Sequence, residues 1–134
     1  LVDERGVPLS IVVTGANRHD VSQLELVLDE IIIDRPDTVQ HLCADKGYTG
    51  EPAQKAIKDR NYIPHVKQRG KEIQEKKDNP QFRCRRWIVE VAHSWFNRFR
   101  KLLVRYEKLT KTYEALLHMA DAIIAFRKAG IIYG

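Results

Sequence analysis

Residues 86–107 constrain the fold more than any other stretch, because their apolar side chains recur at spacings of three and four. The apolar positions are Ile88, Val91, Ala92, Trp95, Phe99, Leu102 and Tyr106. This period predicts one long amphipathic helix that buries a single stripe. At about 100° per residue, Glu90 faces away from that stripe, in a band with Arg86, Asn97 and Lys101. Charged outer faces are usually only solvated surface, so Glu90 needs support from the rest of the chain.

The remaining sequence alternates between strand and helix patterns. The expected elements, in order, are strands 1–3 and 8–14 of a hairpin, a helix from Asp20, strand 39–44, helix 51–60, strand 62–66, a basic loop 67–86, the long helix and a helix 111–128. Asp20 and Gln23 have the spacing of a capping box, and Asp3 to Gly6 has the composition of a turn. This order predicts an α/β fold, with helices packed on a mixed sheet.

Asp45 directly follows strand 39–44 and precedes two glycines, Gly47 and Gly50. Side chains from several elements converge on ligands at the carboxyl ends of strands in α/β sheets, and glycines allow the backbone to turn sharply there. A loop or capping aspartate is the equally weighted alternative. Together with Glu90, Asp45 could hold Mg²⁺ or Mn²⁺, which prefer oxygen ligands. A two-metal site for phosphoryl transfer generally has a third carboxylate, and residues 1–134 offer no convincing one.

The charge balance favours a polyanionic partner. The chain has 23 Lys and Arg against 18 Asp and Glu, a formal net charge of +5. Many basic proteins bind no nucleic acid, so the excess alone is not decisive. Residues 67–86 could grip phosphates or could simply be a soluble loop. No apolar run is long enough to predict a transmembrane helix.

Two segments together resemble bacterial insertion-sequence DDE transposases, especially those of the insertion-sequence-five kind. They are Asp45 to Gly50 (Asp-Lys-Gly-Tyr-Thr-Gly) and 86–102, and residues 1–9 and 14–20 are similar to the same family. The resemblance implies an RNase H-like fold that is incomplete at the N-terminus. It further implies that three acids hold two divalent metal ions, Mg²⁺ or Mn²⁺. Asp45 matches the second acid and Glu90 the third, and the first is expected upstream of Leu1.

Further residue roles follow from the resemblance alone. Residues expected to bind DNA are Lys46, Arg86, Asn97, Arg98, Arg100 and Lys101. Arg86 matches the arginine four positions before the family's glutamate. Asn97 departs from the family, which has a basic residue seven positions after that glutamate. The whole of 1–134 is expected to be a partial catalytic domain, with sheet and helices in 1–66, the basic loop in 67–86 and C-terminal helices in 87–134.

The implied activity is metal-dependent DNA strand cleavage followed by strand transfer of an insertion sequence. The chain alone is expected to be inactive, because the first catalytic aspartate is missing. Expected partners are transposon ends and target DNA, further copies of the protein on DNA, and an upstream-encoded N-terminal segment, with no membrane. A bacterial cytoplasmic, nucleoid-associated location is expected. The alternatives are a catalytically dead DNA-binding remnant and an RNase H-like nuclease that cleaves without joining.

Overall fold

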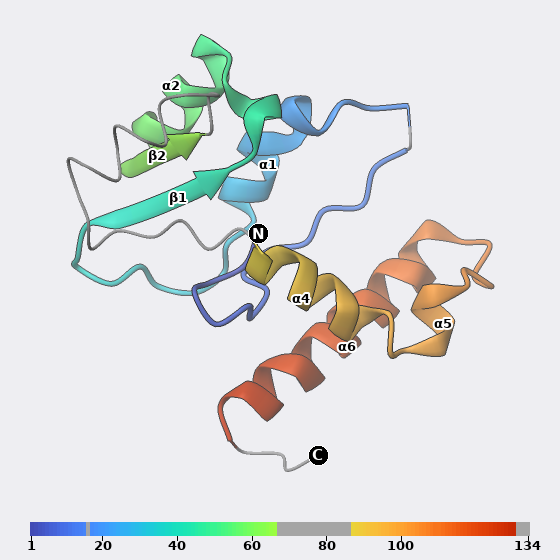
Figure 1. The fold of residues 1–134 in the computed structure, drawn as a ribbon. Coiled ribbons are helices and arrows are strands. Elements are labelled where there is room, and N and C mark those ends of the chain that lie inside the picture. The colour runs from blue at the N-terminus through green and yellow to red at the C-terminus, as the bar shows by residue number, and fades with distance from the viewer. Residues whose placement is uncertain (16, 67–86, 131–134) are drawn as a thin grey trace. The chain divides into compact units, whose positions relative to one another are not determined.

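The structure, a computed structural model, describes residues 1–15, 17–66 and 87–130. The chain divides into two compact units. We call Thr14–Arg86 the strand unit, and Leu1–Val13 together with Trp87–Gly134 the helical unit. Figure 1 shows the helices and strands of both units, and each unit is described by itself. The basic loop predicted at 67–86 lies outside the described residues.

The strand unit contains a parallel β–α–β arrangement. Strand β1 (Gln40–Ala44) pairs in parallel with β2 (Tyr62–Val66), and helix α2 (Glu51–Asp59) connects them (Figure 1). Leu42 lies opposite Pro64 in the register. These three elements confirm the predicted strands and helix to within one residue at each end. Among the described residues the sheet has these two strands, so the chain is an α/β protein with a small parallel sheet.

Helix α2 supplies half of the buried apolar side chains described in the strand unit, and it packs against β2 and α1. Ala53, Ala56 and Ile57 are buried, and Ile57 is fully enclosed. Leu42 of β1 is buried as well, which is consistent with one face of the sheet carrying the core. The burial of Leu42 therefore anchors β1 in the core of the strand unit.

The helix predicted from Asp20 begins there, but its first turn is tighter than expected. A 3₁₀ turn, η1 (Asp20–Gln23), leads into helix α1 (Leu24–Asp29). The predicted capping box is wrong, because His19 is the N-cap residue and no side chain caps the turn. The Ser22 hydroxyl and backbone N–H both donate to the His19 carbonyl, at 2.7 and 3.0 Å. These bonds close a three-residue turn in place of the reciprocal side-chain bonds of a box.

Arg60 joins the ends of α1 and α2. Its Nε and Nη2 donate to the two carboxylate oxygens of Asp29 at 2.7 and 2.8 Å, and Nη2 also reaches Glu25 at 3.3 Å. Its Nη1 donates to the Ala56 carbonyl at 3.0 Å. The guanidinium thus fixes α1 on α2 by a forked ion pair, the geometry in which arginine is most specific.

The helical unit begins with the predicted turn. Asp3 accepts hydrogen bonds from the backbone N–H groups of Arg5 and Val7, both at 2.8 Å, and Gly6 has a φ of +83°. A Cβ at Gly6 would lie 3.1 Å from Cγ2 of Ile88, so glycine also allows the turn to contact the following helix. These contacts confirm Asp3 as a turn residue.

The return strand predicted at 8–14 is wrong beyond its first residues. Val2 and Pro8 form an isolated antiparallel bridge, and the Leu1 amino group donates to the Ser10 carbonyl at 3.1 Å. The residues after Ser10 form no strand in this part of the structure.

The predicted helix 86–107 is also wrong as a single element. Helix α4 (Trp87–Phe96) ends in a turn, and a short helix α5 (Arg100–Leu103) follows. The N–H groups of Arg98 and Phe99 bond to carbonyls three residues back, and Phe99 is extended, with φ −87° and ψ 103°. The N–H groups of Leu102 and Leu103 then bond to the Phe99 carbonyl at 2.8 and 3.0 Å and start the new helix.

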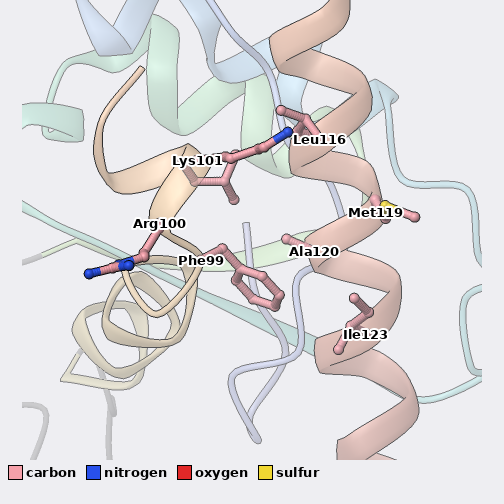
Figure 2. Close-up of a pocket in the computed structure, with 8 residues that line it drawn as sticks. Phe99, Arg100, Lys101, Leu116, Met119, Ala120 and Ile123 are labelled. Carbon is pink, nitrogen blue, oxygen red and sulfur yellow. The ribbon is translucent and has the colours of Figure 1, made fainter. Parts of the chain in front are cut away.

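Helix α6 (Thr110–Lys128) confirms the predicted C-terminal helix and packs against both α4 and α5. Its Ala120 and Ile124 are buried. Figure 2 shows Phe99 directed toward Ala120 and Ile123, whereas Arg100 points away from α6. The Phe99 ring therefore stays on the side of the chain that faces α6, although the helix is broken before it. No helix in the described ranges is long and apolar enough to cross a membrane.

Candidate active site

Asp45 lies at the C-terminal end of β1, as the sequence predicted. It is the N-cap residue of a 3₁₀ turn, η2 (Lys46–Tyr48), and is itself extended, with φ −78° and ψ 179°. Its Oδ1 accepts a hydrogen bond from the Gly47 N–H at 2.8 Å. The carboxylate is exposed, and no described residue donates to Oδ2. Asp45 is thus a capping aspartate that still presents one oxygen to solvent.

Backbone and side-chain bonds hold the η2 turn behind Asp45. The Tyr48 N–H donates to the Asp45 carbonyl at 3.2 Å, and the Thr49 hydroxyl donates to the Lys46 carbonyl at 2.9 Å. Gln54 of α2 donates to the Thr49 carbonyl at 3.1 Å. The turn is therefore tied to α2, whose buried face is part of the core.

Tyr48 is a neighbour of Asp45 that the sequence analysis did not single out. Burial raises the pKa of the Tyr48 phenol, and the nearby negative charges of Asp20 and Asp45 raise it further. Asp20 was interpreted only as a helix cap. Its influence on Tyr48 follows from the proximity of η1 to η2, which depends on long-range packing. The sequence did offer one sign of this neighbour, because Tyr48 follows the strand-end Asp45 by three residues.

Glu90 lies in the first turn of α4, on the exposed side predicted from the helical period. Ile88 and Ala92 are buried on the other side of the helix. No residue in the described part of the chain donates a hydrogen bond to Glu90 or pairs with its charge. Its carboxylate oxygens are therefore available to a ligand from solvent.

The predicted band of partners around Glu90 is wrong at Lys101, which lies in the separate helix α5. Asn97 directly follows α4, and its N–H still donates to the His93 carbonyl at 3.0 Å, as in a helix. Arg86 lies outside the described residues. Asn97 and Lys101 are exposed, but from a different local backbone than expected.

The other residues predicted to bind DNA are all solvent-exposed. They are Lys46 on η2, Arg98 in the turn after α4, and Arg100 on α5. No described acidic side chain forms an ion pair with any of them. By contrast, the Lys128 ammonium group lies 4.2 Å from the centroid of the Trp95 ring. This cation–π contact is made within the helical unit.

Asp45 and Glu90 belong to different units, so the structure describes the surroundings of each separately. Within the described ranges, no group of three or more His, Cys, Asp or Glu side chains is arranged to hold a metal ion. Each carboxylate nevertheless fits a hard divalent cation chemically, because each is exposed and keeps an oxygen that no described donor engages.

Comparison with known proteins identifies the family to which the chain belongs. The family model for the transposase DDE domain matches residues 42–127, a span that includes both Asp45 and Glu90. The chain therefore belongs to the bacterial insertion-sequence DDE transposases.

A relative agrees with this assignment. The chain is 31% identical, over 135 aligned residues, to the protein named "Putative transposase for insertion sequence element IS402" of Burkholderia cepacia. The alignment covers 94% of this chain and 60% of the relative. This chain thus spans about three fifths of the relative's length. No solved structure matches significantly.

Proposed function

We propose that this chain forms part of an RNase H-like catalytic domain that cleaves and joins DNA strands of an insertion sequence. The observation that carries the proposal is the family match over 42–127, which includes a strand-end aspartate and an exposed helix glutamate. Carboxylates on separate elements are the usual way in which proteins hold metals for phosphoryl transfer.

Asp45 and Glu90 are proposed as ligands of Mg²⁺ or Mn²⁺. Asp45 offers Oδ2, because Oδ1 already accepts from Gly47. Glu90 offers both oxygens from the exposed side of α4. A divalent cation held there would supply positive charge to the phosphate oxygens that change during strand cleavage. The missing carboxylate is proposed to come from sequence upstream of Leu1.

DNA is the proposed partner, both as transposon ends and as target, with more than one copy of the protein bound. The exposed cations Lys46, Arg98, Arg100 and Lys101 are proposed to contact phosphates. Arg86 is proposed for the same role from the family pattern. Asn97 can donate and accept hydrogen bonds but neutralises no phosphate, so it contributes less to the salt dependence of binding.

The test compares this chain with a longer protein that carries the upstream coding sequence. Labelled DNA containing the element's ends is incubated with Mn²⁺, and strand cleavage and joining are followed on gels. The longer protein should cleave, and this chain alone should not. Asp45→Asn and Glu90→Gln should each reduce cleavage by more than the roughly 10–100-fold seen for changes around a metal site.

Two exposed carboxylates of the strand unit serve as matched controls. Asp37→Asn and Glu51→Gln make the same chemical change and should leave cleavage within about twofold, because surface substitutions are usually nearly neutral. Full cleavage by Asp45→Asn or Glu90→Gln would refute the proposed site. Salt-dependent DNA binding without cleavage by the longer protein would instead favour the DNA-binding remnant. Nicks without joined products would favour a nuclease.

A further inference from the structure

We propose that Gly47 is a positioning residue that sets the direction of the Asp45 carboxylate, an inference that rests on the proposed metal role of Asp45. The Gly47 N–H donates to Asp45 Oδ1 at 2.8 Å across a single turn. This bond bends the carboxylate back over the start of η2. It satisfies one oxygen and leaves the other directed away from the bond.

The need for glycine at this position is steric. In the described residues, the glycines with positive φ are Gly6 and Gly130, so the Gly47 backbone is one that alanine also adopts. A Cβ at Gly47 would lie 3.0 Å from Asp45 Oδ1 and 3.9 Å from its Cγ. Carbon and oxygen rarely approach so closely, so one of them must move. The atom that moves most easily is the exposed carboxylate oxygen.

Two further hydrogen bonds hold the turn besides the one that Asp45 Oδ1 accepts. The Tyr48 N–H still reaches the Asp45 carbonyl, and the Thr49 hydroxyl still reaches the Lys46 carbonyl. Gly47→Ala is therefore expected to keep η2 and the fold while rotating the carboxylate. Groups that orient a metal ligand typically change metal affinity by about 10–100-fold when altered.

Gly50 provides a matched control in the same loop. Its backbone is ordinary, with φ −61° and ψ 146°, and a Cβ there would meet only Pro52 Cδ at 3.7 Å. Gly50→Ala thus adds the same methyl group without contacting Asp45. Any effect of an extra methyl group on chain flexibility is common to both variants.

The experiment titrates Mn²⁺ into the longer protein that carries the upstream coding sequence, and follows paramagnetic broadening of amide signals next to Asp45. The expected results are a loss of the Asp45-dependent broadening in Asp45→Asn, about tenfold weaker binding in Gly47→Ala, and no change in Gly50→Ala. Circular dichroism establishes that each variant is folded. Equal Mn²⁺ binding by Gly47→Ala and the unaltered chain would overturn the inference while leaving the proposed function intact. Unchanged broadening in Asp45→Asn would instead refute the metal role on which both rest.

A second measurement needs no variant. The hydrogen bond from the Gly47 nitrogen to the Asp45 carboxyl carbon should give a scalar coupling across the bond in labelled protein. Its detection supports the positioning role. Its absence, with coupling observed across the backbone bonds of α2 under the same conditions, would contradict it.

Discussion

Ile57→Ala is the sharpest test of the packing that holds the candidate site. Among the described residues, Ile57 of α2 is the largest fully buried side chain, with 0% of its surface exposed. The change removes three carbon groups, which at about 0.8 kcal/mol each amounts to about 2.4 kcal/mol of lost transfer free energy. The cavity left behind adds to this, so the expected loss of unfolding free energy is about 3–4 kcal/mol, within the usual range of about 2–5.

Ile32→Ala makes the same change at a residue that is 91% exposed and should cost less than about 0.5 kcal/mol. Urea unfolding followed by circular dichroism measures both variants. Hydrogen exchange of β1 amides then localises the loss to the strand unit, because local opening free energies are read residue by residue. Equal effects of Ile57→Ala and Ile32→Ala would refute the burial of Ile57 in the core of the strand unit.

Two ionisable groups give further predictions. Asp20→Asn should lower the pKa of the Tyr48 phenol, because it removes one of the two charges that oppose the phenolate, and an NMR pH titration of the Tyr48 ring measures this. An unchanged pKa of Tyr48 in this variant would show that the Asp20 charge does not act on the phenol. Burial raises the pKa of Asp121, against the opposing charges of His118 and the Leu1 amino group, and no described residue donates to its Oδ1. Its contribution to stability is present below the ordinary aspartate pKa and lost as the pH rises through the raised value. Asp121→Asn should therefore raise the melting temperature at pH 7 and leave it nearly unchanged at pH 3, and equal shifts at both would contradict the assignment.

The sequence predicted the strand unit well because its signals there are local. Period-two and period-3.6 patterns, Pro52 in the first turn of α2, and the turn residues between them all point to the same elements. The errors have local causes as well. The capping box at Asp20 gave way to a tighter turn closed by Ser22, and the segment predicted as a strand after Pro8 forms only the Val2–Pro8 bridge and no ladder.

The candidate site shows the same division. The position of Asp45 at a strand end followed from the order of elements, and the exposure of Glu90 followed from the helical period. The glycine after Asp45 was expected to serve backbone turning. Its φ is ordinary, and its role is to leave room for the carboxylate that its own N–H binds. Such a role depends on a side-chain rotamer, which no sequence period encodes.

The break between α4 and α5 changes how the proposed DNA contacts can be arranged. In a continuous helix, Lys101 would share the face of Glu90, and one surface would carry both metal ligand and phosphate contact. In the structure, Phe99 is extended and directed toward α6, and Arg100 points away from that helix (Figure 2). Arg100 and Lys101 are therefore positioned by the turn at Phe99, which with Ala120 and Ile123 lines a pocket beside α6, whereas Glu90 is positioned by the buried side of α4. Because separate parts of the unit position them, a smaller residue at Phe99 is expected to disturb the proposed phosphate contacts while leaving Glu90 in place.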